Sequence, residues 1–62
     1  MDTVQFYDVH YTATTHRGDA VERCATFLSR NKNEAELSAK HHYGQLRGFR
    51  ILWIDPIGTN PF

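Results

Sequence analysis

Cysteine, net charge and long apolar runs are all scarce in this sequence of 62 residues. The one cysteine, Cys24, has no second cysteine to pair with, so an internal disulfide is excluded. A lone thiol favours a reducing compartment such as the cytoplasm. No apolar run approaches the ~20 residues that span a bilayer, so we expect no membrane segment. The start, Met1-Asp2-Thr3, lacks the basic and apolar stretches of a signal peptide, which favours the same compartment.

Charge and length limit the classes of function. Seven Lys and Arg residues cancel seven Asp and Glu residues. A neutral chain lacks the bulk electrostatic attraction of a general nucleic-acid binder. A chain this short buries only roughly 60% of the surface that it exposes when unfolded, so its fold is marginal when alone. Small folds of this kind are usually stabilised by disulfides, a metal or a partner.

Motifs for catalysis, metal binding and cofactor binding are missing as well. The four glycines are scattered and form no phosphate-binding loop, and no two carboxylates stand out as an acid–base pair. His41 and His42 are adjacent, so on a helix they point about 100° apart, and no histidine spacing matches a zinc signature. Cys24 falls in the middle of an expected strand, with no helix N-terminus to activate its thiol. We therefore expect no enzyme activity, no cofactor and no metal.

Alternating residues at the start of the chain predict a β-hairpin. Residues 4–13 and 19–29 read as strands, and Gly18 closes a three-residue loop between them. This loop pairs Val9 with Ala25 and Tyr7 with Phe27, which places the odd-numbered apolar row of both strands on one face.

The middle of the chain predicts a helix over residues 32–43. Asn31 is its expected N-cap, Glu34 can reach back as in a capping box, and Gly44 is the expected stop. The side of the helix that faces the sheet is expected to consist of Ala35, Ala39, His42, Tyr43 and Leu46.

A third strand is expected over residues 49–55, ended by Pro56 because proline has no amide proton to donate. Its apolar character on both faces is typical of a strand covered on both sides. A right-handed crossover through the helix places it beside the first strand. The sequence therefore predicts an α+β fold of the ββαβ type: a three-stranded antiparallel sheet of order 2-1-3, with one helix on one face. Residues 1–57 form one domain, and residues 58–62 form a loose tail.

One helix covers only one face of a sheet. The other face is expected to carry five residues of the hairpin and one of the two apolar rows of the third strand, with the choice of row left open. The hairpin residues are Phe6, His10, Cys24, Thr26 and Leu28. A face with this much apolar surface predicts a binding partner, and a second copy of the chain is one candidate. The expected anchors for partner binding are Phe6, Leu28, Arg50 and Trp53, with Leu37 on the outer side of the helix as a further candidate.

The segment over residues 27–39, followed by Tyr43-Gly44 and a final strand, resembles many tiny proteins of phages and mobile elements. In size and element order the chain is similar to some anti-CRISPR proteins. The resemblance implies non-catalytic binding to a host protein complex as an inhibitor or modulator. Two alternatives remain at this point. Strand aromatics beside arginines can stack on nucleotide bases, which suits a small nucleic-acid-binding or regulatory protein. The third possibility is a homodimeric structural module.

Overall fold

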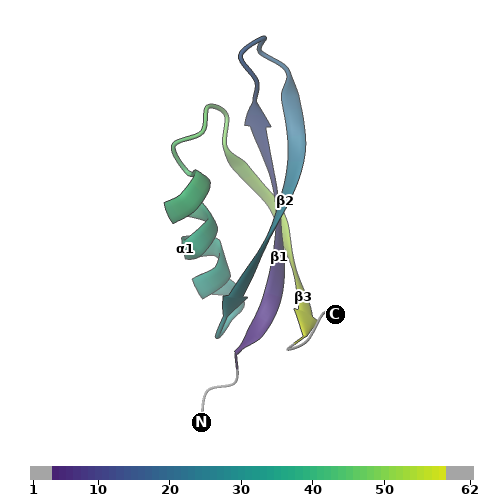
Figure 1. Ribbon diagram of the computed structural model, residues 1–62, viewed down its shortest axis with the longest axis vertical. Coiled ribbons are helices and arrows are strands. Elements are labelled where there is room, and N and C mark those ends of the chain that lie inside the picture. The colour runs from purple at the N-terminus through teal and green to yellow at the C-terminus, as the bar shows by residue number, and fades with distance from the viewer. Residues whose placement is uncertain (1–3, 59–62) are drawn as a thin grey trace.

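Three strands and one helix make up the computed structural model, which describes residues 4–58. In chain order they are β1 (Gln5–Thr14), β2 (Ala20–Ser29), α1 (Lys32–Tyr43) and β3 (Arg50–Gly58). The strands form one antiparallel sheet of order β2-β1-β3, and α1 lies along one side of it (Figure 1). The predicted ββαβ fold and its strand order are confirmed. The described part of the chain has no helix of the length and apolar character that crossing a membrane requires.

The β1–β2 hairpin has the predicted register. Thr15 and Asp19 close the loop, with the Thr15 amide donating to the Asp19 carbonyl at 2.8 Å. Gly18 has a φ of +90°, a conformation that favours glycine. Val9 pairs with Ala25 and Tyr7 with Phe27, so the odd-numbered rows of both strands share a face. The loop length and the apolar pattern therefore specify the same register.

Helix α1 begins and ends where the sequence predicts. The Asn31 side chain accepts a hydrogen bond from the Glu34 amide at 2.8 Å, and the Glu34 carboxylate accepts one from the Arg30 amide at 3.3 Å. The second bond reaches one residue further back than in a standard capping box. Ala35 and Ala39 are fully buried, so the helix backbone lies close to the sheet.

The buried side of α1 is narrower than predicted. Tyr43 is half-buried, whereas His42 and Leu46 are exposed. The His42 ring lies 5.7 Å from that of Phe27, so it rests on the rim of the core. Leu46 comes after the helix has ended, in the loop that leads to β3. The prediction that Leu46 faces the sheet is therefore wrong, because helical periodicity does not extend past Gly44, whereas His42 contacts the sheet only at the rim of the core.

The core lies between α1 and the odd-numbered row of β1. Its buried apolar residues are Tyr7, Val9, Tyr11, Ala35, Ala39 and Ile54. Aromatic rings extend this core towards the loop after the helix: Tyr11 stacks on Tyr43 at 5.1 Å and contacts Phe49 at 5.4 Å. The Tyr7 hydroxyl accepts a hydrogen bond from the side-chain Nε2 of Gln5 at 2.8 Å, which satisfies this buried polar group.

Strand β3 differs most from its prediction. It continues through Pro56 to Gly58, and Pro56 pairs with Tyr7. Because β3 is an edge strand, one side of its backbone has no neighbouring strand within residues 4–58, and proline is tolerated there. The prediction that Pro56 ends the strand is wrong, and within residues 4–58 the helix covers only one face of β3. Gly58, assigned to the tail, belongs to the sheet, and residues 59–62 lie outside the described residues.

Candidate functional site

The side of the sheet away from α1 has no covering element within residues 4–58 (Figure 1). We call this side the open face. Because paired residues of antiparallel strands point to the same side, the register assigns its members. They are Phe6, Asp8, His10 and Thr12 from β1, Glu22, Cys24, Thr26 and Leu28 from β2, and Arg50, Trp53 and Asp55 from β3.

A bulge in β3 decides which of its residues reach the open face. His10 pairs with Trp53 and Tyr11 pairs with Ile51, so Leu52 is an extra residue opposite no partner in β1. The bulge separates Trp53 from Ile51 and sends them to opposite faces. Simple alternation predicted that β3 would contribute a continuous apolar row to the open face. It contributes Arg50, Trp53 and Asp55 instead.

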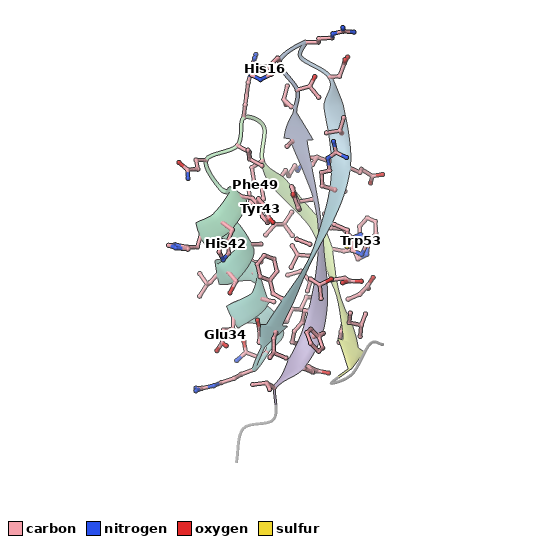
Figure 2. All side chains as sticks on the ribbon, viewed as in Figure 1. His16, Glu34, His42, Tyr43, Phe49 and Trp53 are labelled. Carbon is pink, nitrogen blue, oxygen red and sulfur yellow. The ribbon has the colours of Figure 1, made fainter. Side chains whose placement is uncertain are left out.

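His10 lies at the centre of the open face and is held by its neighbours. The Trp53 ring stacks on the His10 ring with centroids 4.3 Å apart and an interplanar angle of 17°. The Asp55 carboxylate Oδ2 lies 3.4 Å from His10 Nε2 and accepts a hydrogen bond from the Trp53 indole at 3.0 Å. One carboxylate oxygen thus positions both rings. Figure 2 shows Trp53 projecting from the sheet on the side opposite α1.

Strand β2 adds a thiol and a hydroxyl to this centre. Cys24 lies directly across from His10, with Sγ 4.0 Å from Nε2. Thr26 lies directly across from Asp8, and its hydroxyl donates a hydrogen bond to Asp8 Oδ1 at 2.6 Å. The nearest ligand-type atoms of Asp8, His10 and Cys24 all lie within 4.8 Å of one another. We call these three residues the Cys-His-Asp cluster.

The chemical state of Cys24 argues against a nucleophilic role. Cys24 is exposed, but partial desolvation by its neighbours raises the pKa of its thiol above the ordinary value, and the charges of Asp8 and Asp55 raise this pKa further. The thiol is therefore protonated near neutral pH, whereas nucleophilic cysteines depend on the thiolate. The fold brings a cysteine, a histidine and a carboxylate together, but without a bound cation their surroundings disfavour a thiolate.

Slow alkylation of Cys24 is the expected result of its raised pKa. With iodoacetamide at pH 8, we expect Cys24 to react more slowly than free cysteine, and the rate to keep rising above pH 9. Asp8→Asn is expected to move the rate profile to lower pH, because it removes one of the two negative charges. Glu36→Gln, on the helix, is the matched control and should leave the profile unchanged. A parent profile equal to that of free cysteine would contradict this account.

Four of the five residues predicted as anchors share the open face. Phe6 and Leu28 are paired at one end of it, Trp53 lies at its centre and Arg50 at the other end. Leu28 and Trp53 are 56% and 48% exposed, while Phe6 is half-buried. Leu37 is 64% exposed and lies on α1, on the other side of the molecule, so it belongs to a different surface.

Comparison with protein-family models, curated proteins and solved structures finds no match to this chain. Its function must therefore be argued from the open face itself.

The Cys-His-Asp cluster was missed at the level of sequence. Asp8 and His10 are two residues apart, and Cys24 is fourteen residues beyond His10, which matches no known ligand spacing. The signal that was available is the hairpin register. It pairs His10 with Cys24 once Gly18 is taken as the turn residue. Applied to polar residues as well as to apolar ones, this register predicts the cluster.

Proposed function

We propose that this chain is a non-catalytic protein-binding inhibitor or modulator of a host system, of the phage or anti-CRISPR type, which acts in the cytoplasm through its open face. The observation that carries the proposal is the exposed Trp53 at the centre of a sheet face with no covering element from the described residues. Tryptophan is enriched among residues that dominate protein interfaces, particularly near the interface centre. Its stacking on His10 fixes the ring in advance of binding.

The charges of the open face favour a protein partner over a nucleic acid. Asp8, Glu22 and Asp55 are carboxylates, and Arg50 is the only Lys or Arg among the residues assigned to this face. Three carboxylates against one guanidinium give the open face net negative charge, which repels phosphates. A protein surface with arginine or lysine side chains around an apolar patch complements this pattern. We therefore expect a basic partner surface.

The apolar residues of the open face lie at its centre and at one end. Leu28 and Phe6 form a cross-strand pair at the end where β1 begins. Trp53 lies two paired rows away from this pair, beyond Asp8 and Asp55. A partner that covers both apolar sites also covers the two carboxylates, so its basic groups must contact them. This requirement limits the partner to surfaces that are both apolar and positively charged.

Trp53→Ala is expected to lower the affinity for the partner at least ~30-fold, the range of an interface hot spot. The variant is expected to keep its fold, because Trp53 is half-exposed and outside the core. Leu46→Ala, also exposed but in the loop after α1, is the matched control and should bind like the parent. Affinity purification from host lysate with and without nuclease identifies the partner, and surface plasmon resonance then measures the variants.

Two results would contradict the proposal. The first is capture that nuclease treatment abolishes, which would favour the nucleic-acid alternative. The second is a parent chain that sediments as a dimer and binds no other partner, together with a Phe6→Glu variant that is a folded monomer. That result would favour the homodimeric module. Leu37→Ala, measured in the same series, shows separately whether the outer side of α1 takes part in binding.

A further inference from the structure

We propose that the Cys-His-Asp cluster is a binding site for Zn²⁺ or a similar divalent transition-metal ion, with Cys24 Sγ, His10 Nε2 and an Asp8 carboxylate oxygen as its ligands. This inference is independent of the proposed function, because metal binding at these residues requires no partner. It also departs from the expectation drawn from sequence spacing, which excluded a metal.

The distances suit a tetrahedral ion. Zinc bonds of about 2.3 Å to sulfur and 2.0–2.1 Å to nitrogen or oxygen place tetrahedral ligand atoms roughly 3.3–3.6 Å apart. Sγ and Nε2 are 4.0 Å apart, and all three ligand atoms lie within 4.8 Å of one another. Movements of about 1.5 Å or less close the remaining gap. Rotation of the side chains supplies such movements without a change in the sheet.

The backbone holds the three ligands in place. His10 and Cys24 are direct partners across the β1–β2 pair, and Asp8 follows on the same face of β1 as His10. Side chains in direct and diagonal cross-strand positions are within contact distance of each other. All three positions lie in the interiors of two ten-residue strands, so the ligands are fixed by sheet hydrogen bonds. Sites built on such elements are more defined than sites on loops.

Groups around the cluster support a cation. Thr26 donates its hydroxyl hydrogen bond to Asp8 Oδ1, which orients the carboxylate in the way that outer-shell partners orient metal ligands. Asp55 adds a second negative charge 3.4 Å from His10 Nε2. In the metal-bound form Nε2 turns from Asp55 to the ion, and Asp55 remains as a neighbouring charge.

The donor set selects the class of metal. Binding of the ion displaces the proton of the Cys24 thiol to the solvent. The resulting thiolate, an imidazole and a carboxylate together suit Zn²⁺, whereas Mg²⁺ and Ca²⁺ take oxygen ligands almost exclusively. Three protein ligands on an exposed face leave the fourth tetrahedral position to water or to a group from outside the chain.

Binding of Co²⁺ and Zn²⁺ to the reduced full chain tests the proposal. Co²⁺ is expected to give the visible bands of a tetrahedral complex and a near-ultraviolet thiolate-to-metal charge-transfer band, and Zn²⁺ to displace it at one equivalent. Saturating Zn²⁺, at about a hundredfold excess over Kd, is expected to raise Tm by about 10–20 °C. An absent charge-transfer band, or an unchanged Tm at saturating Zn²⁺, would overturn the proposal.

Variants separate this site from adventitious binding by surface histidines. Cys24→Ser is expected to abolish the charge-transfer band and to weaken Zn²⁺ binding at least ~100-fold, and it conserves the shape of the side chain. Thr26→Val is expected to weaken binding about 10–100-fold without removing a ligand. His16→Ala and His41→Ala are the matched controls, and both residues are exposed outside the open face. Zn²⁺ binding that survives Cys24→Ser, or that either control abolishes, would contradict the assignment.

Phe6→Glu distinguishes this proposal from the proposed function. Phe6 lies on the open face but supplies no ligand, so Phe6→Glu is expected to retain Zn²⁺ binding while it loses the partner. Loss of partner binding with Zn²⁺ binding intact supports both proposals. Zn²⁺ binding without any protein partner for the parent chain leaves the metal site standing and removes the proposed function.

Discussion

Ala39→Asp is expected to unfold the domain. Ala39 is fully buried where α1 lies against the sheet, together with Ala35 one turn earlier. A carboxylate at this position enters a core with no cationic group in its cluster, and its desolvation costs several kcal/mol. A 62-residue domain has a total unfolding free energy of about 3–9 kcal/mol, so the charge removes most or all of it.

Circular dichroism and thermal melting measure this effect. We expect Ala39→Asp to show no cooperative transition at neutral pH. Leu37→Asp is the matched control on the same helix, and its side chain is 64% exposed. It is expected to change the free energy of unfolding by less than about 1 kcal/mol. Similar melting of the two variants would mean that α1 presents a different side to the sheet.

Gly48→Ala is expected to lower Tm by about 10–40 °C. Gly48 has a φ of +69°, and a Cβ built there runs into the Thr14 side chain. The left-handed conformation costs an alanine roughly 1–2 kcal/mol, and the crowding adds about 1–3 kcal/mol. The close approach has a structural cause, because the Thr14 amide donates to the Arg47 carbonyl at 2.7 Å and holds the loop against the end of β1.

Gly18→Ala separates the two contributions. Gly18 also has positive φ, but a Cβ there meets no atom within 4 Å. Its substitution therefore reports conformational strain alone, about 1–2 kcal/mol. Thr14→Ala combined with Gly48→Ala is expected to recover part of the loss in a double-mutant cycle, because it removes the Oγ1 atom that the new Cβ meets. Equal Tm losses at the two glycines would refute the crowding at Gly48.

The hairpin and the helix were predictable because independent local signals agreed. Gly18 placed the turn, and the odd-numbered apolar row selected the same pairing. Asn31 and Glu34 marked the start of the helix, and the two buried alanines lay on one side of it. Where turn chemistry, capping and periodicity point to the same elements, sequence alone specifies both boundaries and faces.

Strand β3 and the loop before it were not predictable for a physical reason. The position of a bulge depends on how the strand pairs with its neighbour. No residue type in β3 identifies Leu52 as the bulged residue. Likewise, the positive φ fell on Gly48, whereas Gly44, the expected stop, keeps a helical φ of −60°. Both features depend on how the returning chain meets β1. The Cys-His-Asp cluster is different, because its members lie on the β1–β2 hairpin, and the predicted register places Cys24 opposite His10 once it is applied to the polar residues.

The bulge at Leu52 also bears on how the length of this chain can vary. With Leu52 set aside, Arg50, Ile51, Trp53 and Ile54 alternate between the two faces without interruption. A strand one residue shorter at this point therefore keeps every contact of Trp53 with His10 and of Ile54 with the core. Loss of a residue on the other side of Trp53 would instead exchange the residues of the two faces. Among related proteins, we expect one-residue deletions in β3 to be tolerated at the bulge and to be selected against beyond Trp53.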